Sequence, residues 1–96
     1  MKRQGDLLIM SIPKVPENAV SKQHRVLAEG EVTGHLHELD SGEVYEENGT
    51  LFFRVAPETR ATLNHPEHAA LTFEPGVYKV VRQREYEPKG WRIVAD

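Results

Sequence analysis

The sequence contains no cysteine. Disulfide bridges and thiolate ligands are therefore excluded, and a metal ion could be held here by nitrogen and oxygen atoms alone. The apolar run at residues 7–10 is far shorter than the ~20 residues that cross a bilayer, and too short for the core of a secretion signal. From these absences we expect a cytoplasmic protein without membrane association.

The chain also lacks a strong excess of charge of either sign. Fifteen acidic and 12 basic side chains give a formal net charge of -3. A mildly acidic chain gains nothing from general attraction to phosphate backbones or anionic lipids. Nucleic-acid binding would therefore require a local basic surface that works against the overall charge.

What the sequence does contain is the composition of one folded domain. The 96 residues are 39 % hydrophobic and 28 % charged, which is typical of a globular protein and not of a disordered one. A chain of this length supports one hydrophobic core. Because no internal repeat or low-complexity tract interrupts it, we expect a single domain over residues 1–96.

Short β-prone segments recur along the chain between turn residues. Asn48-Gly49 lies between two of them and is a strong hairpin signal. No long window has a helical period. We expect a surface loop over residues 13–23, in which residues 17–22 are the one place where a short helix could form. The expected fold is therefore all-β, a small barrel or sandwich of short antiparallel strands. The expected strands are residues 7–12, 24–28, 31–39, 43–46, 50–55, 60–63, 71–73, 77–86 and 91–94.

Four of the five histidines fall into two close pairs. His35 and His37 are two residues apart, so on a strand both rings point to the same face. His65 and His68 flank Pro66 and Glu67 in a segment typical of a turn, which can aim both rings in one direction. If the strands that carry the two pairs are paired or face each other, all four rings meet.

Such a cluster predicts a metal site. Imidazole suits zinc, copper, iron and nickel, and three or four nitrogen ligands favour zinc or nickel at His35, His37, His65 and His68. Glu38, Glu43 or Glu67 could add an oxygen ligand or a hydrogen bond to a ring N–H. An open coordination position would let the ion activate water or bind a small anion, so catalysis stays an open question. His24 stands apart, and we expect it to be structural.

Two other interpretations compete with the metal site. In the first, the histidines are ordinary hydrogen-bonding residues of a structural module, which forms a homo-oligomer because its strand edges need partners. In the second, the C-terminal hairpin binds single-stranded nucleic acid, because basic and aromatic residues alternate there as in known stacking platforms. The residues concerned are Tyr78, Lys79, Arg82, Arg84, Tyr86, Lys89, Trp91 and Arg92.

Three motifs stand out: RQGD at residues 3–6, EGEVTGHLH at 29–37 and PGVYKVVRQREY at 75–86. Together they resemble a family of small uncharacterised proteins of bacterial and phage type. The resemblance covers most of the chain and implies a single domain without a known activity.

A second resemblance concerns the segment around the first histidine pair. A glycine, an HxH pair, a glutamate and a further glycine follow one another at Gly30, His35, His37, Glu43 and Gly49. This order is similar to the first motif of cupins, and it implies a small metal-binding β-barrel. The spacings on both sides of the histidine pair depart from that motif, and no histidine follows the Pro75-Gly76 turn.

Overall fold

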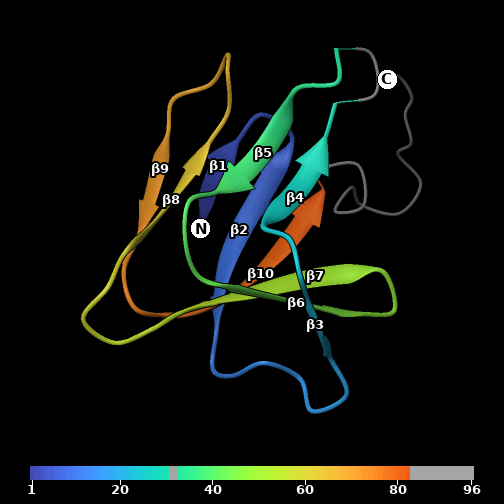
Figure 1. Cartoon of the computed structure of the whole chain (residues 1–96), viewed down its shortest axis with the longest axis vertical. Coiled ribbons are helices and arrows are strands. Elements are labelled where there is room, and N and C mark those ends of the chain that lie inside the picture. Colours follow the sequence, from blue (N-terminus) through green and yellow to red (C-terminus); the bar gives the residue numbers. More distant parts are fainter. Residues whose placement is uncertain (31–32, 83–96) are drawn as a thin grey trace.

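The chain forms ten short strands, and every strand pair is antiparallel (Figure 1). The structure is a computed structural model that describes residues 1–30 and 33–82. Its strands are β1 (Lys2–Gln4), β2 (Leu7–Ile12), β3 (Val20–Lys22), β4 (Val26–Glu29), β5 (Leu36–Leu39), β6 (Glu43–Glu47), β7 (Thr50–Val55), β8 (Ala61–Asn64), β9 (Leu71–Phe73) and β10 (Gly76–Arg82).

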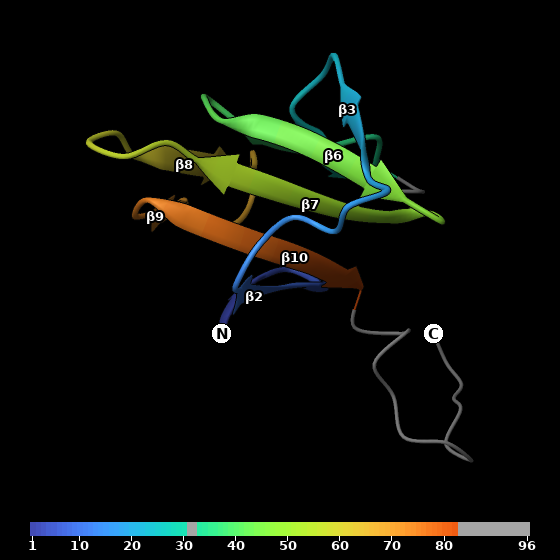
Figure 2. The same ribbon diagram turned by 90° about the horizontal axis from the view of Figure 1, so that it is seen from below.

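The strands form two open sheets. One has six strands in the order β1-β2-β10-β7-β6-β3, and the other has four in the order β4-β5-β8-β9. Figure 2 shows β10 between β7 and β2 in the larger sheet. Because neither sheet closes on itself within the described residues, the arrangement is sandwich-like. The predicted all-β fold is confirmed, as a sandwich and not as a closed barrel.

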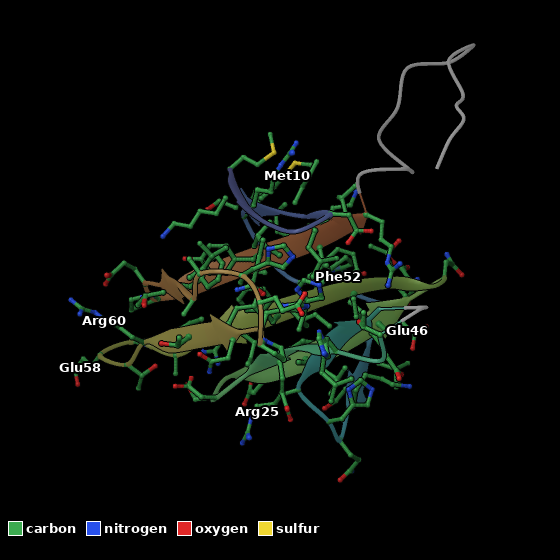
Figure 3. The ribbon with its side chains drawn as sticks, turned by 90° about the horizontal axis from the view of Figure 1, so that it is seen from above. Met10, Arg25, Glu46, Phe52, Glu58 and Arg60 are labelled. Atoms are coloured by element: carbon green, nitrogen blue, oxygen red, sulfur yellow. The ribbon has the colours of Figure 1, made fainter. Side chains whose placement is uncertain are left out.

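The core lies where side chains of both sheets meet. Phe53 of β7 packs edge-on against Phe73 of β9, with ring centroids 5.2 Å apart, and stacks on Tyr78 of β10 at 5.0 Å. The first contact joins the two sheets and the second joins neighbouring strands of the larger sheet. Aromatic rings suit this position because each buries much apolar area. Charged side chains such as Arg25 and Arg60 project outward at the margins (Figure 3).

The hairpin of β6 and β7 forms as the Asn-Gly pair predicts. Asn48 and Gly49 both have positive φ, 52° and 83°, and Glu47 pairs with Thr50 directly across the turn. Two consecutive positive φ angles characterise the type I′ turn, whose twist matches the right-handed twist of the two strands that it joins.

Three elements differ from expectation. The strand expected over residues 31–39 begins only at Leu36 in the described residues, so His35 lies before β5 and not on it. The expected surface loop over residues 13–23 contains a turn and the short strand β3, and residues 17–22 do not form the helix that was possible there. β1 was not expected at all, since Lys2 and Arg3 are exposed and Gln4 is its one buried side chain. A three-residue strand with two charged side chains has no apolar alternation to reveal it. In the part of the chain that the structure describes, no helix is long and apolar enough to span a membrane.

The basic strand near the C-terminus is central in its sheet. β10 pairs with β2 on one side and with β7 on the other, so its described residues offer no free edge to a partner. Among the described strands, β1, β3, β4 and β9 lie at the ends of the two sheets. Residues 83–86 of the expected strand and the expected strand 91–94 lie outside the described residues. Assembly into an oligomer stays a prediction.

Candidate functional site

The pairing of β5 with β8 brings the two histidine pairs together. Glu38 pairs with Asn64 and Leu39 with Leu63. The same antiparallel register, continued by one residue, sets His37 opposite His65. Their ring centroids are 4.3 Å apart. The pairing of the two strands, which the sequence left as a condition for the four rings to meet, is therefore present.

All four rings gather in what we term the histidine cluster, which consists of His35, His37, His65 and His68. His65 is central, with its ring centroid 4.5 Å from that of His68 and 5.7 Å from that of His35. The rings of His37 and His68 are nearly parallel at 6.2 Å. Residues that are about thirty positions apart in the sequence thus form one group of imidazoles.

The members of the histidine cluster differ in exposure. His37 is 5 % exposed, because alternation along β5 turns it and Leu39 inward while Leu36 faces solvent. Burial, and after it the neighbouring His65, lowers the pKa of His37 to about 4. Burial also lowers the pKa of His65, followed by the effects of His68 and His35. Both rings are therefore mainly neutral at pH 7, the state in which imidazole binds metals.

A buried glutamine from β1 contacts the histidine cluster. Gln4 is 2 % exposed, and its Oε1 lies 2.9 Å from His37 Nδ1. Its Nε2 donates to the carbonyl oxygens of Leu63 and Ala69, both at 2.9 Å. No sequence pattern assigns a role to Gln4. The RQGD motif marked the position, but nothing in the local pattern indicated that this polar side chain is buried.

The glycine that follows lies directly against two of the rings. Gly5 has φ +60°, and a Cβ atom there would be 3.0 Å from His68 Nε2 and 3.3 Å from His37 Cε1. Real Cβ atoms essentially never approach other atoms more closely than the first of these distances. The β1–β2 turn therefore needs glycine both for its backbone angle and for the room that the rings occupy.

Glu67 lies beside the histidine cluster and contacts two of its members. Its backbone N–H donates to His65 Nδ1 at 3.0 Å, and its carboxylate Oε2 is 3.8 Å from His35 Nδ1. The second distance is too long for a hydrogen bond. His35 Nδ1 is buried and has no hydrogen-bond partner among the described residues.

The other expected contributors lie elsewhere. Glu43 on β6 accepts hydrogen bonds from the Tyr45 hydroxyl at 2.8 Å and from Arg54 at 3.3 Å. Glu38 is exposed on β5 and alternates with the inward-facing His37. His24 accepts a hydrogen bond from the N–H of Val26 at 3.3 Å. Of the three expected carboxylates, Glu67 alone is near the rings.

The spacing of the ring centres is close to what a shared ion requires, but the side chains as placed do not form a complete ligand shell. Two imidazoles on one tetrahedral zinc ion have ring centres about 5 Å apart, given Zn–N bonds of ~2.0 Å. The observed separations, from 4.3 to 6.2 Å, fall on both sides of that value. Within residues 1–30 and 33–82, however, no three His, Asp or Glu side chains form a ready-made ligand shell.

The described part of the basic, aromatic surface offers little to nucleic acid. The Tyr78 ring packs between Phe53 and Phe73, and its hydroxyl donates to the carbonyl of Glu74 at 2.6 Å. Arg82 lies 3.9 Å from the Asp6 carboxylate. Lys79 is partly buried on β10. The other five residues of this expected surface lie outside the described part: Arg84, Tyr86, Lys89, Trp91 and Arg92.

Comparison with known proteins gives a family but no activity. No curated protein and no solved structure matches the chain significantly. Residues 3–83 match the model of a domain family of unknown function, DUF8820, and this range includes Gln4 and the whole histidine cluster. The chain thus belongs to the DUF8820 family.

Proposed function

We propose that this domain binds one divalent transition-metal ion, zinc or nickel, through the histidine cluster. The observation that carries the proposal is the convergence of four imidazoles, two from the β5 segment and two from the bend after β8, at separations near those of rings on one ion. His37 is buried at the inner side of this cluster, His35 and His65 are partly buried, and His68 is exposed, so an ion held there could be reached from solvent.

Two further observations support a ligand at this place. The lowered pKa values of His37 and His65 favour neutral rings, so binding near pH 7 would displace few protons. His35 Nδ1 is a buried polar atom without a partner among the described residues, and such an atom calls for an explanation such as an ion.

Metal binding requires the rings to turn. His65 Nδ1 accepts the Glu67 N–H, so the proton of the neutral His65 ring is on Nε2. His65 can coordinate through Nδ1 in place of that N–H, or through Nε2 once the proton has moved to Nδ1. Either route breaks a hydrogen bond worth about 1 kcal/mol. His65 and His68 follow the end of β8, where strand pairing no longer constrains the backbone, so their rings can turn.

The ligand number decides what the ion could do. Four histidines would close a tetrahedral site, which is typical of structural zinc, whereas three would leave a position for water or a small anion. The proposal covers binding and no reaction. It agrees with the cupin resemblance in setting metal-binding histidines on a β scaffold, but here the second pair comes from the bend after β8 and not from a later strand.

Elemental analysis of protein purified without an affinity tag tests the proposal. We expect about one equivalent of zinc or nickel per chain, and a higher melting temperature when either ion is added to the metal-free protein. The double variant His35→Ala/His37→Ala should lose both effects, and the control His24→Ala should keep them.

The proposal fails if the metal content stays below about a tenth of an equivalent and neither ion shifts the melting temperature. It fails equally if the double variant binds zinc as the wild type does, because the ion would then be held elsewhere.

A further inference from the structure

Gln4 has hydrogen-bond partners that allow only one orientation of its amide. The carbonyl oxygens of Leu63 and Ala69 lie at one end of the side chain, 2.9 Å from Nε2. Carbonyl oxygens accept and cannot donate, so the NH₂ group must face them. Oε1 is then the atom that faces His37 Nδ1 at 2.9 Å.

This orientation determines the proton position on His37. Oε1 is an acceptor, so the ring nitrogen beside it must be the donor. A neutral imidazole carries one N–H, and with Nδ1 protonated the lone pair is on Nε2. We propose that Gln4 is a positioning residue, which holds His37 as the Nδ1–H tautomer and leaves Nε2 free as the coordinating atom. The second part of this proposal, coordination through Nε2, rests on the proposed function.

The same glutamine links the two histidine pairs. Its acceptors, Leu63 and Ala69, lie on either side of the bend that carries His65 and His68, and its oxygen binds the ring of His37. One buried amide therefore fixes the ends of one ligand-bearing segment and the ring orientation of the other. Hydrogen bonds from outer residues to metal-binding histidines commonly fix the ring tautomer in this way.

Gln4 cannot be replaced without loss of one of these functions. Glutamate keeps the acceptor for His37 but has no N–H for the two carbonyls. Methionine has nearly the same shape and supplies neither. Gln23, which is exposed, offers a matched control in Gln23→Met.

The tautomer is measured by nitrogen-15 NMR of histidine-labelled, metal-free protein at neutral pH. We expect the wild type and Gln23→Met to show His37 with a protonated Nδ1 and an unprotonated Nε2. Gln4→Met should move the population toward Nε2–H, and Gln4→Glu should retain Nδ1–H. The proposal is overturned if wild-type His37 is the Nε2–H tautomer, and this result does not depend on whether any variant folds. It is also overturned if Gln4→Met leaves the tautomer of His37 unchanged.

Zinc titration of the same proteins separates this proposal from the proposed function. We expect Gln4→Met to bind zinc about 10- to 100-fold more weakly than Gln23→Met. Equal affinities would overturn the positioning role and leave the metal site intact. If the wild type shows the Nδ1–H tautomer and yet binds no zinc, the proposed function fails while the hydrogen-bonding role of Gln4 stands.

Discussion

At the scale of single residues, His37 couples protonation to stability. Its pKa is about 4 in the folded protein and about 6.5 when the ring is free, so the unfolded chain binds the proton more tightly. Burial is the main cause, and His65, His68 and Arg82 act in the same direction, whereas Asp6 acts against them. The neutral ring thus stabilises the fold fully above pH 6.5, and this contribution is lost as the pH falls toward 4.

We therefore predict that the free energy of unfolding of the metal-free protein falls by on the order of 3 kcal/mol between pH 6.5 and 4 on account of His37. Urea denaturation with a chelator present measures this dependence. The variant His37→Gln cannot titrate and should show a flatter profile, while His24→Ala should follow the wild type. Identical profiles for His37→Gln and wild type would contradict the role of His37.

The backbone of Glu67 should report directly on the metal. Coordination by His65 through either ring nitrogen ends the hydrogen bond that the Glu67 N–H donates to it. We predict that zinc shifts the amide resonance of Glu67 strongly and raises its hydrogen-exchange rate. The N–H of Val26, which donates to His24, serves as the control and should not respond. An unchanged Glu67 amide in zinc-saturated protein would mean that His65 is not a ligand.

At the scale of elements, two glycine turns have the same backbone requirement but different surroundings. Gly5 and Gly49 both have positive φ. A Cβ at Gly49 would meet nothing within 4 Å, whereas one at Gly5 would be 3.0 Å from His68 Nε2 and 3.3 Å from His37 Cε1, so the rings would have to shift. The two positions therefore separate the cost of a left-handed backbone from damage to the histidine cluster.

We predict that Gly49→Ala lowers the free energy of unfolding by about 1–2 kcal/mol and leaves zinc affinity unchanged. Gly5→Ala should lose a similar amount through its backbone, and in addition it should weaken zinc binding at least tenfold by displacing His68. Denaturation and calorimetric zinc titration of both variants provide the comparison. Equal zinc affinities in the two variants would show that the β1–β2 turn does not shape the site.

The elements that could be predicted are those with strong local signals. The hairpin around Asn48-Gly49 and the apolar strand β2 form where the sequence indicates them. β1 and β3 could not be found this way, because their conformation comes from pairing with β2 and β6 and not from their own side chains. A strand of three residues carries too short a pattern to be distinguished from a loop.

The same distinction, between residues with a local sequence signal and residues placed by the fold, applies to the candidate site. The histidine spacing predicts two rings on one face of a strand, although His35 lies just before β5, and the pairing of β5 with β8 brings the second pair to them. Gln4 could not be predicted, because its burial depends on the carbonyls of Leu63 and Ala69, about sixty residues away. Local patterns reveal which side chains could bind a metal ion, whereas the hydrogen-bond partners of a residue such as Gln4 are set by the tertiary structure.

At the scale of the whole molecule, stability depends on the aromatic contact between the sheets. Phe53 is fully buried and touches Phe73 of the other sheet. We predict that Phe53→Ala lowers the free energy of unfolding by about 3–5 kcal/mol, a large share of the ~5–15 kcal/mol typical of a domain. Val20→Ala, at a position that is 63 % exposed, should change it by less than about 0.5 kcal/mol. Thermal denaturation of both variants measures the difference, and similar losses would show that the sheets are not joined through Phe53.

The fold as a whole brings distant histidines to one point, and that convergence is the central claim. X-ray absorption spectroscopy of the zinc-loaded protein tests it most directly, because imidazole rings give a distinct scattering pattern and can be counted. We expect three or four imidazole nitrogens at about 2.0 Å around one zinc ion, with fewer in the His35→Ala/His37→Ala variant. A zinc ion surrounded by oxygen, or by a single imidazole, would contradict the claim that the two pairs share an ion.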